Sequence, residues 1–528
     1  MKQLGIAIIL CCLAAGNVLA TWCESPLLGM KSSAMIRRYL GDLADSSSGF
    51  AVVRSIGATS GTDGTPPRPI TAILITENAS WEDDSGKPTV IITGAIHGNE
   101  WATPEVCIGI AEYLLDNKDN DAPPRDARGE LIISKAGGAA AGTGEIIAGP
   151  ASIRDLLKRL QVIIIPVYNP EGYDYSQTPE GKMSYYGAGW RPNRRKLALN
   201  PQEEICYRQD GIPYPAPPAG AEHCFLADYD DTASGGEVEE ESVMVCESTD
   251  GTEVHLFEPA LNVASAGMFD AIYGSQDPAR VVCASGRRRV WKEQWSSDDA
   301  DRVSLDRARK EGYLQDAYGT DINRNFQYKW DVTENQKHLF IRSRSPGSRM
   351  YRGPGSISEP ESDAMERLIA GRNVIALIDY HAGSTQVLYP YAYSTEAKVN
   401  RDILGGRDGR SDYEVFHAIA EKIAAILNRY GSADRSITGY TAAQNYNGTS
   451  VGSGVARDCY YQTEGIAALN IEVHDRRYTY GEAEFIQVVP EICRTNVPGA
   501  VWFLFRAAEL AAERQGAVAG KGQESGSK

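Results

Sequence analysis

The chain has 528 residues, of which 42% are hydrophobic and 23% are charged, as is usual for a globular protein with a large core. Its formal net charge of −17 argues against a nucleic-acid partner, because phosphate binding needs a basic surface. After the N-terminal segment no apolar stretch is long enough to span a bilayer, so we expect no membrane-embedded part.

Residues 1–20 predict a secretory signal peptide. Lys2 precedes a compact apolar run, and Val18-Leu-Ala20 supplies small residues at the expected cleavage site. An uncleaved anchor is the alternative, but the run is short for a membrane span. We therefore expect a secreted, extracellular protein.

Cleavage at this site would remove Cys11 and Cys12 and leave eight cysteines. They are at positions 23, 107, 206, 224, 246, 283, 459 and 493. An even number in a secreted chain suggests disulfide bonds, although the sequence does not give their pairing. No C-x-x-C is present, so a cysteine-ligated structural zinc is not expected. Asn78 and Asn447 begin glycosylation sequons, which matter only if the host glycosylates.

Apolar periodicity and turn residues predict strands alternating with helices along the chain. Helices are expected near 33–45, 103–115, 151–160, 412–429 and 498–514, and strands near 70–75, 89–94, 162–167, 374–380, 386–391 and 466–471. Such alternation is typical of an α/β fold with a mixed, mostly parallel twisted sheet and helices on both faces. Residues 21–515 would form this domain, and residues 516–528 a disordered polar tail.

The pattern breaks down between residues 197 and 311. Proline- and glycine-rich segments, an acidic run from Asp228 to Glu241 and four of the eight cysteines fall here. We interpret this stretch as a long insertion or a small cysteine-containing subdomain. The acidic run is expected to be exposed to solvent, with a calcium site as the alternative.

Polar residues directly follow four of the predicted strands. They are His97 with Glu100, Asn169 and its neighbours to Tyr173, His381, and Glu472. The carboxyl ends of parallel strands meet at one edge of a sheet, where α/β proteins place their active sites. A histidine and a glutamate three residues apart can bind one metal ion, although this spacing alone is common and could be a surface turn.

Seven short segments, in this order, resemble signature segments of the M14 family of zinc carboxypeptidases. They are Gly-Ala-Ile-His-Gly-Asn-Glu-Trp, Asn-Pro-Glu-Gly-Tyr, Trp-Arg-Pro-Asn-Arg, Asp-Ile-Asn-Arg-Asn-Phe, Asp-Tyr-His, Leu-Tyr-Pro-Tyr and Asn-Ile-Glu-Val. The resemblance runs from about residue 30 to about residue 510, with the insertion outside it. It implies a carboxypeptidase A/B-like monomer that hydrolyses the C-terminal bond of peptides or proteins and releases single amino acids.

The resemblance also implies a catalytic zinc site. One zinc ion would be held by His97, Glu100 and His381, with the fourth position open to water. Asp321 would hydrogen-bond His97 and fix its tautomer, with a turn cap as the alternative role. Glu472 would be the general base that takes a proton from the activated water and passes it to the leaving amine.

Arginines are expected to recognise the substrate. Arg324, assisted by Asn323, matches the residue that binds the terminal carboxylate through two parallel hydrogen bonds. Arg191 matches the arginine that polarises the scissile carbonyl and stabilises the oxyanion. Because Arg194 and Arg195 are close by, an offset of one turn stays open.

Two positions depart from the family pattern. Tyr446 is the candidate for the mobile tyrosine that closes over the substrate, but the loop to Asp458 is longer than in pancreatic-type relatives and Asn447 is a sequon. Tyr440, or a purely structural tyrosine, is the alternative. Arg457 stands where the family lines the floor of the pocket for the C-terminal side chain. A buried guanidinium there predicts a preference for C-terminal Glu or Asp, unless the longer loop turns it to solvent.

Two other functions stay open. A related zinc deacylase or amidohydrolase uses the same His-Gly-Asn-Glu segment, although the Asn-Ile-Glu segment favours a carboxypeptidase. An inactive, peptide-binding relative is the other, although the expected metal ligands and the general base are all present.

Overall fold

The computed structural model describes residues 30–524 with internal gaps. The gaps are 63–64, 84, 136–143, 147–148, 184–188, 197–220, 230–240, 249–253, 258–318, 332–348, 400, 402, 405–409, 430–436, 447, 449–450 and 475–481. The predicted signal peptide, Asn447 and most of the 197–311 insertion therefore lie outside the described residues.

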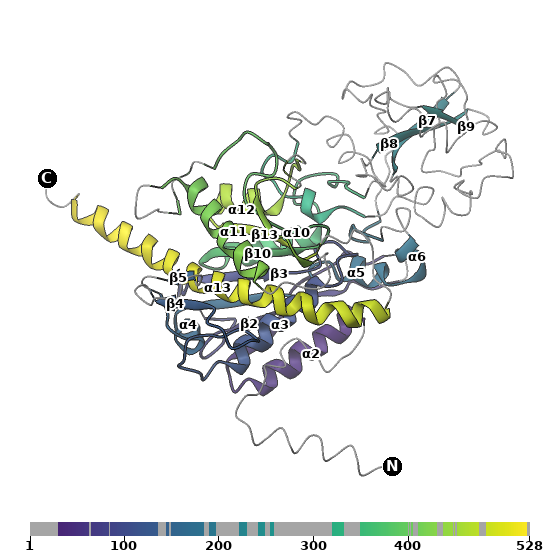
Figure 1. Ribbon diagram of the computed structural model, residues 1–528. Helices are drawn as coiled ribbons and strands as arrows, with labels where there is room; N and C mark the ends of the chain where they lie inside the picture. The colour runs from purple at the N-terminus through teal and green to yellow at the C-terminus, as the bar shows by residue number, and fades with distance from the viewer. Residues whose placement is uncertain are drawn as a thin grey trace, which may run out of the picture.

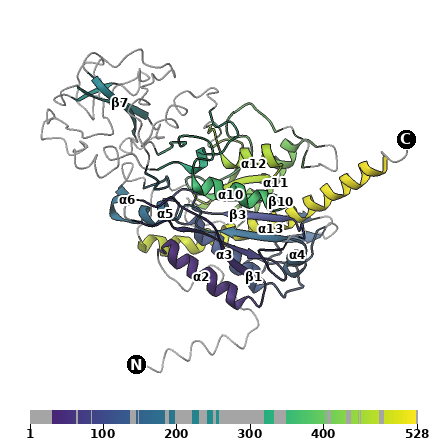
Figure 2. The ribbon, with the colours of Figure 1, turned by 180° about the vertical axis from the view of Figure 1, so that it is seen from behind.

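An eight-stranded mixed sheet forms the centre of the described chain, in the order β1-β2-β6-β3-β10-β13-β11-β12 (Figures 1 and 2). The strands are β1 (Ala51–Ala58), β2 (Pro69–Ile75), β6 (Gln161–Ile165), β3 (Thr89–Thr93), β10 (Val374–His381), β13 (Ala467–Glu472), β11 (Gln386–Leu388) and β12 (Thr441–Ala443). The central strands β6, β3, β10 and β13 are parallel to one another. On one side β2 is antiparallel to both β6 and β1, and on the other side β11 is antiparallel to β13. The predicted α/β fold is therefore confirmed.

The central strands are buried on both faces, which explains their continuous apolar sequences. Every residue of β3, β6 and β10 is buried. Helices on both sides of a parallel sheet remove the alternation of polar and apolar residues that a half-exposed strand shows. These strands were predictable as short β-branched runs that end in glycine or polar residues.

Helices cover both faces of the sheet (Figure 1). One face packs against α2 (Ser33–Ser46), α3 (Thr103–Asp116), α4 (Ile153–Arg159), α11 (Asp412–Asn428) and α13 (Glu482–Glu524). The other face packs against α10 (Pro360–Ala370) and α12 (Ala456–Glu464). Shorter elements are α5 (Pro170–Ser176), α6 (Pro179–Met183), the 3-10 turn η1 (Ile322–Arg324), β4 (Ile133–Lys135) and β5 (Gly144–Ile146). No helix in the described part of the chain is long and apolar enough to cross a bilayer.

The last helix, α13, is longer at both ends than the predicted 498–514. It contains Pro490 and Pro498, which usually end a helix at a cost of about 3 kcal/mol each. Core residues beside the prolines are buried and oppose that cost, namely Ile492, Cys493 and Val497. The helix continues to Glu524 and so overlaps the tail predicted at 516–528, whose disorder stays a prediction.

The cysteines do not all behave as disulfide partners. Cys107, Cys459 and Cys493 are free and buried, so the expectation of disulfides is wrong for these three. They lie in helices packed against the sheet, where a thiol serves as a small apolar side chain. Within the insertion, β7 (Ala221–Tyr229), β8 (Glu241–Ser248) and β9 (Val254–Phe257) form an antiparallel sheet whose backbone register sets Cys224 opposite Cys246. Pairing of the remaining cysteines stays a prediction.

Candidate active site

The carboxyl ends of three neighbouring strands bring the predicted metal and base residues together. β3, β10 and β13 are adjacent in the sheet, and the register of β10 and β13 pairs His381 directly with Glu472. His97 and Glu100 lie in the turn that connects β3 to α3. Residues far apart in sequence, such as His97 and Glu472, therefore meet at one sheet edge.

Close backbone packing shapes the turn that carries His97 and Glu100. A Cβ on Gly98 would lie 2.5 Å from the backbone of Gly172 in α5, so this contact requires glycine. The Gly98 N–H donates to the Arg191 carbonyl at 2.8 Å. The turn is therefore fixed against the segment that carries the predicted oxyanion-binding arginine.

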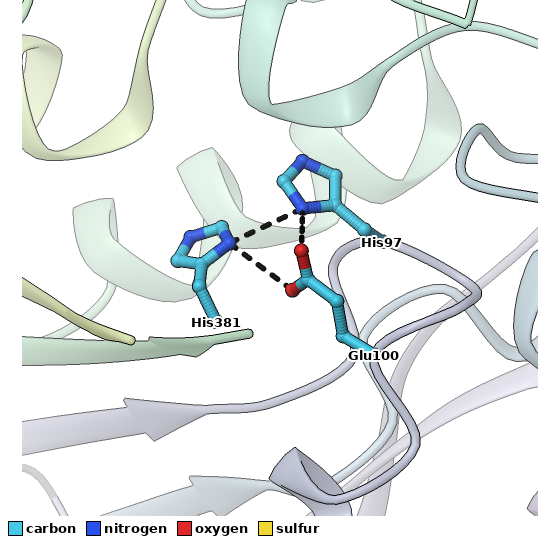
Figure 3. A group of neighbouring side chains, drawn as sticks. All are labelled: His97, Glu100 and His381. Carbon is cyan, nitrogen blue, oxygen red and sulfur yellow. Dashed lines mark hydrogen bonds and ion pairs between the residues drawn. The ribbon is translucent and has the colours of Figure 1, made fainter. Parts of the chain in front are cut away.

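His97, Glu100 and His381 form a buried cluster that could hold a metal ion (Figure 3). The two Nδ1 atoms lie 3.2 Å apart, and Glu100 places Oε1 2.7 Å from His97 Nδ1 and Oε2 3.2 Å from His381 Nδ1. Ligands about 2.0–2.1 Å from a tetrahedral zinc ion are about 3.3 Å from one another, so the spacing of the two nitrogens fits zinc. Glu100 Oε2 is buried without a hydrogen-bond partner in the described chain, as expected for an oxygen that would bind a cation.

Asp321 contacts both His97 and Arg191. Its Oδ1 lies 3.2 Å from His97 Nε2, and its Oδ2 accepts from Arg191 Nε at 3.0 Å. Burial alone would raise the pKa of Asp321, but the charges of Arg191, His97 and Arg324 hold it well below its usual value. Asp321 Oδ1 also accepts from the Asn323 N–H at 2.9 Å. Asp321 is therefore both the hydrogen-bond partner of His97 and the cap of the turn that begins at Ile322.

Glu472 lies beside the cluster and is only 7% exposed. Its Oε2 has no hydrogen-bond partner among the described residues. Burial raises the pKa of Glu472 to about 7, against the opposing charge of His381. A carboxyl group that titrates near neutrality can both accept a proton and return it.

The two candidate tyrosines have different surroundings. Tyr446 donates from its hydroxyl to the Gly383 carbonyl at 2.6 Å. A Cβ on Gly383 would lie 3.3 Å from that hydroxyl and 3.8 Å from Glu472 Oε2, so Tyr446 reaches the vicinity of Glu472. Tyr440 is buried and donates to the Val473 carbonyl at 2.7 Å. The geometry favours Tyr446 and gives Tyr440 a structural role.

Arg457 lies in the first turn of α12 and is 4% exposed. Its Nη2 donates to the Gln444 carbonyl at 2.8 Å, whereas its Nε has no hydrogen-bond partner in the described chain. The Asp458 carboxylate is 3.8 Å from Arg457 Nε and accepts instead from the N–H groups of Ala392 and Tyr393. The alternative that a longer loop turns Arg457 to solvent is therefore wrong, because α12 begins before this residue and places it inside.

Asn323 and Arg324 lie in η1. Arg324 is partly exposed and donates from Nη1 to the Asn323 carbonyl at 2.9 Å. Its guanidinium packs on Gly452, where a Cβ would lie 3.2 Å from Arg324 Cζ. The Asn323 side chain is used internally: Oδ1 accepts from the Ala456 N–H at 3.0 Å, and Nδ2 is 3.3 Å from His381 Nε2.

The three neighbouring arginines have different partners. Arg191 contacts Asp321 beside the cluster, whereas Arg194 stacks on two aromatic rings. Arg195 forms an ion pair with the buried Glu359 at 3.1 Å. Of the three, Arg191 is therefore the one that lies beside the cluster.

One buried carboxylate at the cluster was not among the predicted site residues. Asp379 Oδ2 lies 2.8 Å from His381 Nε2. Its sequence signal is its place two residues before a predicted ligand in a strand, where alternate side chains share a face.

Comparison with known proteins identifies the family of the chain. The family model described as zinc carboxypeptidase, peptidase M14, matches residues 36–130 and 284–495. The metallocarboxypeptidase A-like protein of Trichophyton verrucosum is 36% identical over 92 residues, 16% of this chain and 20% of the relative. Mast cell carboxypeptidase A of Rattus norvegicus is 34% identical over 88 residues, again 16% of this chain and 20% of the relative. The matched regions thus span about a fifth of the length of these two relatives.

A solved structure of carboxypeptidase A from Helicoverpa armigera aligns with 96% of this chain and 78% of its own, at 16% identity and a TM-score of 0.48. The family match covers more than half of the chain, and the buried cluster and Glu472 fall inside the matched ranges. The chain therefore belongs to the zinc carboxypeptidase family, M14.

Proposed function

We propose that the protein is a secreted zinc-dependent carboxypeptidase that hydrolyses C-terminal peptide bonds and releases single amino acids. The observation that carries this proposal is the convergence of His97, Glu100 and His381 with Glu472 at the ends of adjacent strands. Two imidazoles and one carboxylate are a donor set typical of catalytic zinc. Zinc bound there would polarise the scissile carbonyl and lower the pKa of a bound water. Secretion rests on the signal-like sequence of residues 1–20.

Glu472 is the proposed general base. It would take a proton from the attacking water and return it to the leaving amine, and its pKa of about 7 suits both transfers. Because it is not one of the three clustered ligand candidates, it can act without giving up a metal contact.

Arg191 is the proposed oxyanion-stabilising residue. Asp321 binds its Nε at 3.0 Å, and its Nη1 lies 3.9 Å from Glu100 Oε1, so the end of the guanidinium lies next to the metal-ligand candidates. Negative charge that develops on the scissile carbonyl oxygen would be stabilised there without movement of the side chain.

Arg324 is the proposed receptor for the free C-terminal carboxylate. Its planar guanidinium can form two parallel hydrogen bonds with a carboxylate, and its orientation is fixed by Gly452 and the Asn323 carbonyl. Asn323 supports the site through this carbonyl and through its contact with His381. Tyr446 would exchange its bond to the Gly383 carbonyl for one to the substrate as the site closes.

Arg457 is the proposed determinant of the C-terminal side-chain preference. A buried guanidinium whose Nε has no hydrogen-bond acceptor among the described residues is costly, and a substrate Glu or Asp carboxylate would supply that acceptor. We therefore propose that peptides with acidic C-terminal residues are the preferred substrates.

Two peptides that differ only at the C-terminus, free acid in one and amide in the other, test the proposed function. We expect the mature protein to shorten the free acid one residue at a time, and to act at least about 100-fold more slowly on the amide, because Arg324 loses its charged partner. A mass-spectrometric time course measures both. Binding without shortening would instead indicate an inactive relative, and equal cleavage of acid and amide a deacylase or amidase.

A further inference from the structure

We propose that Asp379 is a positioning residue that fixes the tautomer of His381 and so sets the affinity of the site for its metal ion. The inference rests on the proposed zinc site and adds to it a residue outside the predicted set. The inference has three requirements. The Asp379 carboxylate must have a fixed orientation, and it must determine which ring nitrogen of His381 carries the proton. The metal-free fold must also tolerate the loss of the Asp379 charge.

Asp379 is held from both sides inside the sheet. It is 2% exposed, and its Oδ1 accepts from the Thr93 hydroxyl at 2.6 Å while its Oδ2 lies 2.8 Å from His381 Nε2. Thr93 is the direct register partner of Asp379 across β3 and β10. Because Asp379 and His381 are two residues apart in one strand, their side chains lie on the same face of the sheet. The sheet itself therefore fixes the orientation of the carboxylate.

The carboxylate determines which ring nitrogen of His381 carries the proton. A neutral imidazole has one N–H, and an N–H at Nε2 that donates to Asp379 leaves the Nδ1 lone pair facing Glu100 and His97. The other neighbour of Nε2 is Asn323 Nδ2 at 3.3 Å, which is a donor because Asn323 Oδ1 already accepts from a backbone N–H. Asp379 is thus the acceptor that the ring proton requires.

His97 has a carboxylate partner in the same position as His381 does. Asp321 Oδ1 lies 3.2 Å from His97 Nε2, so His97 also directs its Nδ1 into the cluster. Each of the two histidines is then backed by its own buried carboxylate. Both rings direct Nδ1 into the cluster (Figure 3). A carboxylate behind an imidazole also makes the ring a stronger ligand.

Charge in this region explains why the role of Asp379 depends on the metal. Glu100, Asp321 and Asp379 are all buried, and Arg191 offsets one of these charges through its contact with Asp321. A divalent cation would neutralise the remaining excess, and the Asp379 carboxylate adds to the attraction for it. Loss of the Asp379 charge should therefore weaken cation binding, whereas Asp379→Asn can keep the hydrogen bonds to Thr93 and His381 in the metal-free fold.

Asp379→Asn is the decisive variant because it keeps the size of the side chain. The amide oxygen would keep the hydrogen bond from Thr93, which turns the NH₂ group towards His381 Nε2. His381 must then accept at Nε2 and carry its proton on Nδ1, where the metal would bind. We expect the zinc dissociation constant to rise by about 10- to 100-fold.

Competition with a chromophoric zinc chelator measures this affinity on the full-length mature protein, and urea unfolding of the metal-free protein measures the fold separately. Glu361→Gln is the matched control, because Glu361 is also buried, at 1% exposure, but contacts Asn193 rather than a ligand candidate. The expected result is weaker zinc binding for Asp379→Asn only, with an unfolding midpoint like that of the metal-free wild type.

Unchanged zinc affinity in a folded Asp379→Asn protein would overturn the inference, and so would a lower unfolding midpoint with unchanged affinity. If that variant does not fold, Thr93→Val releases Oδ1 while leaving the carboxylate in place, and is expected to weaken zinc binding by a smaller factor. Wild-type affinity in the valine variant would then overturn the proposal. Failure of the wild-type protein itself to bind zinc would overturn the proposed metal site before any variant is compared.

Discussion

Glu472→Gln is expected to lower kcat for peptide hydrolysis by about 10²- to 10⁴-fold. Glutamine keeps the shape of the side chain but cannot accept the proton of the attacking water. Because Glu472 is outside the cluster of ligand candidates, the variant should bind zinc as the wild type does. Amino-acid release from a peptide at saturating concentration measures kcat, and metal analysis of the same sample measures bound zinc.

Glu112→Gln is the control for this variant. Glu112 is 8% exposed, and burial raises its pKa to about 7, so it resembles Glu472 in environment. It lies in α3, however, and accepts a hydrogen bond from Tyr39 in α2. It should keep the wild-type rate. A Glu472→Gln protein that releases amino acids as fast as the wild type would show that another group is the base.

Arg457→Leu is expected to remove the preference for acidic C-terminal residues. For the wild type, kcat/KM should be about 100-fold higher for a peptide ending in Glu than for the same peptide ending in Phe, because a buried guanidinium needs a charged acceptor. Leucine leaves an apolar floor, so the ratio should fall below one. Rates at low substrate concentration for the matched peptide pair measure the ratio directly.

Arg514→Leu provides the comparison for this change. Arg514 is a partly buried arginine that donates to the Gly465 carbonyl at 2.8 Å at the far end of α12, and its loss should leave the Glu-to-Phe ratio unchanged. Equal or faster release of Phe than of Glu by the wild-type protein would contradict the proposed pocket.

The fold was predictable where burial leaves a clear pattern. The buried strands β3, β6, β10 and β13 appear as short apolar runs, and α2 and α11 show helical periodicity behind a serine cap. Strand β1 was missed because it lies at the sheet edge and is largely half-exposed or exposed, with Arg54 and Ser55 in its middle. Helix α12 was missed because its first turn follows a glycine-rich loop and carries Arg457 and Asp458, which is typical of a turn.

Some residues of the candidate site were likewise predictable from sequence and others were not. His97, Glu100, His381 and Glu472 could be proposed from sequence because they follow strands and match family segments in order. Tyr446 could be named as the candidate for the mobile tyrosine with Tyr440 as the alternative, but only their partners in space distinguish the two.

Two further features depend on packing between distant elements. The burial of Arg457 depends on where α12 begins, and the role proposed for Asp379 depends on the register that places Thr93 opposite it. Sequence spacing contains neither of these facts.

Zinc titration of chelator-stripped protein tests the central claim most directly. With a peptide that ends in a free glutamate, we expect no release of amino acid without metal, and a rate that rises in proportion to added zinc up to one ion per chain. Magnesium and calcium should not replace zinc, because a site with two imidazole ligands suits neither. Release of C-terminal residues at the full rate by the stripped protein, or a rate that does not follow bound zinc, would contradict the account.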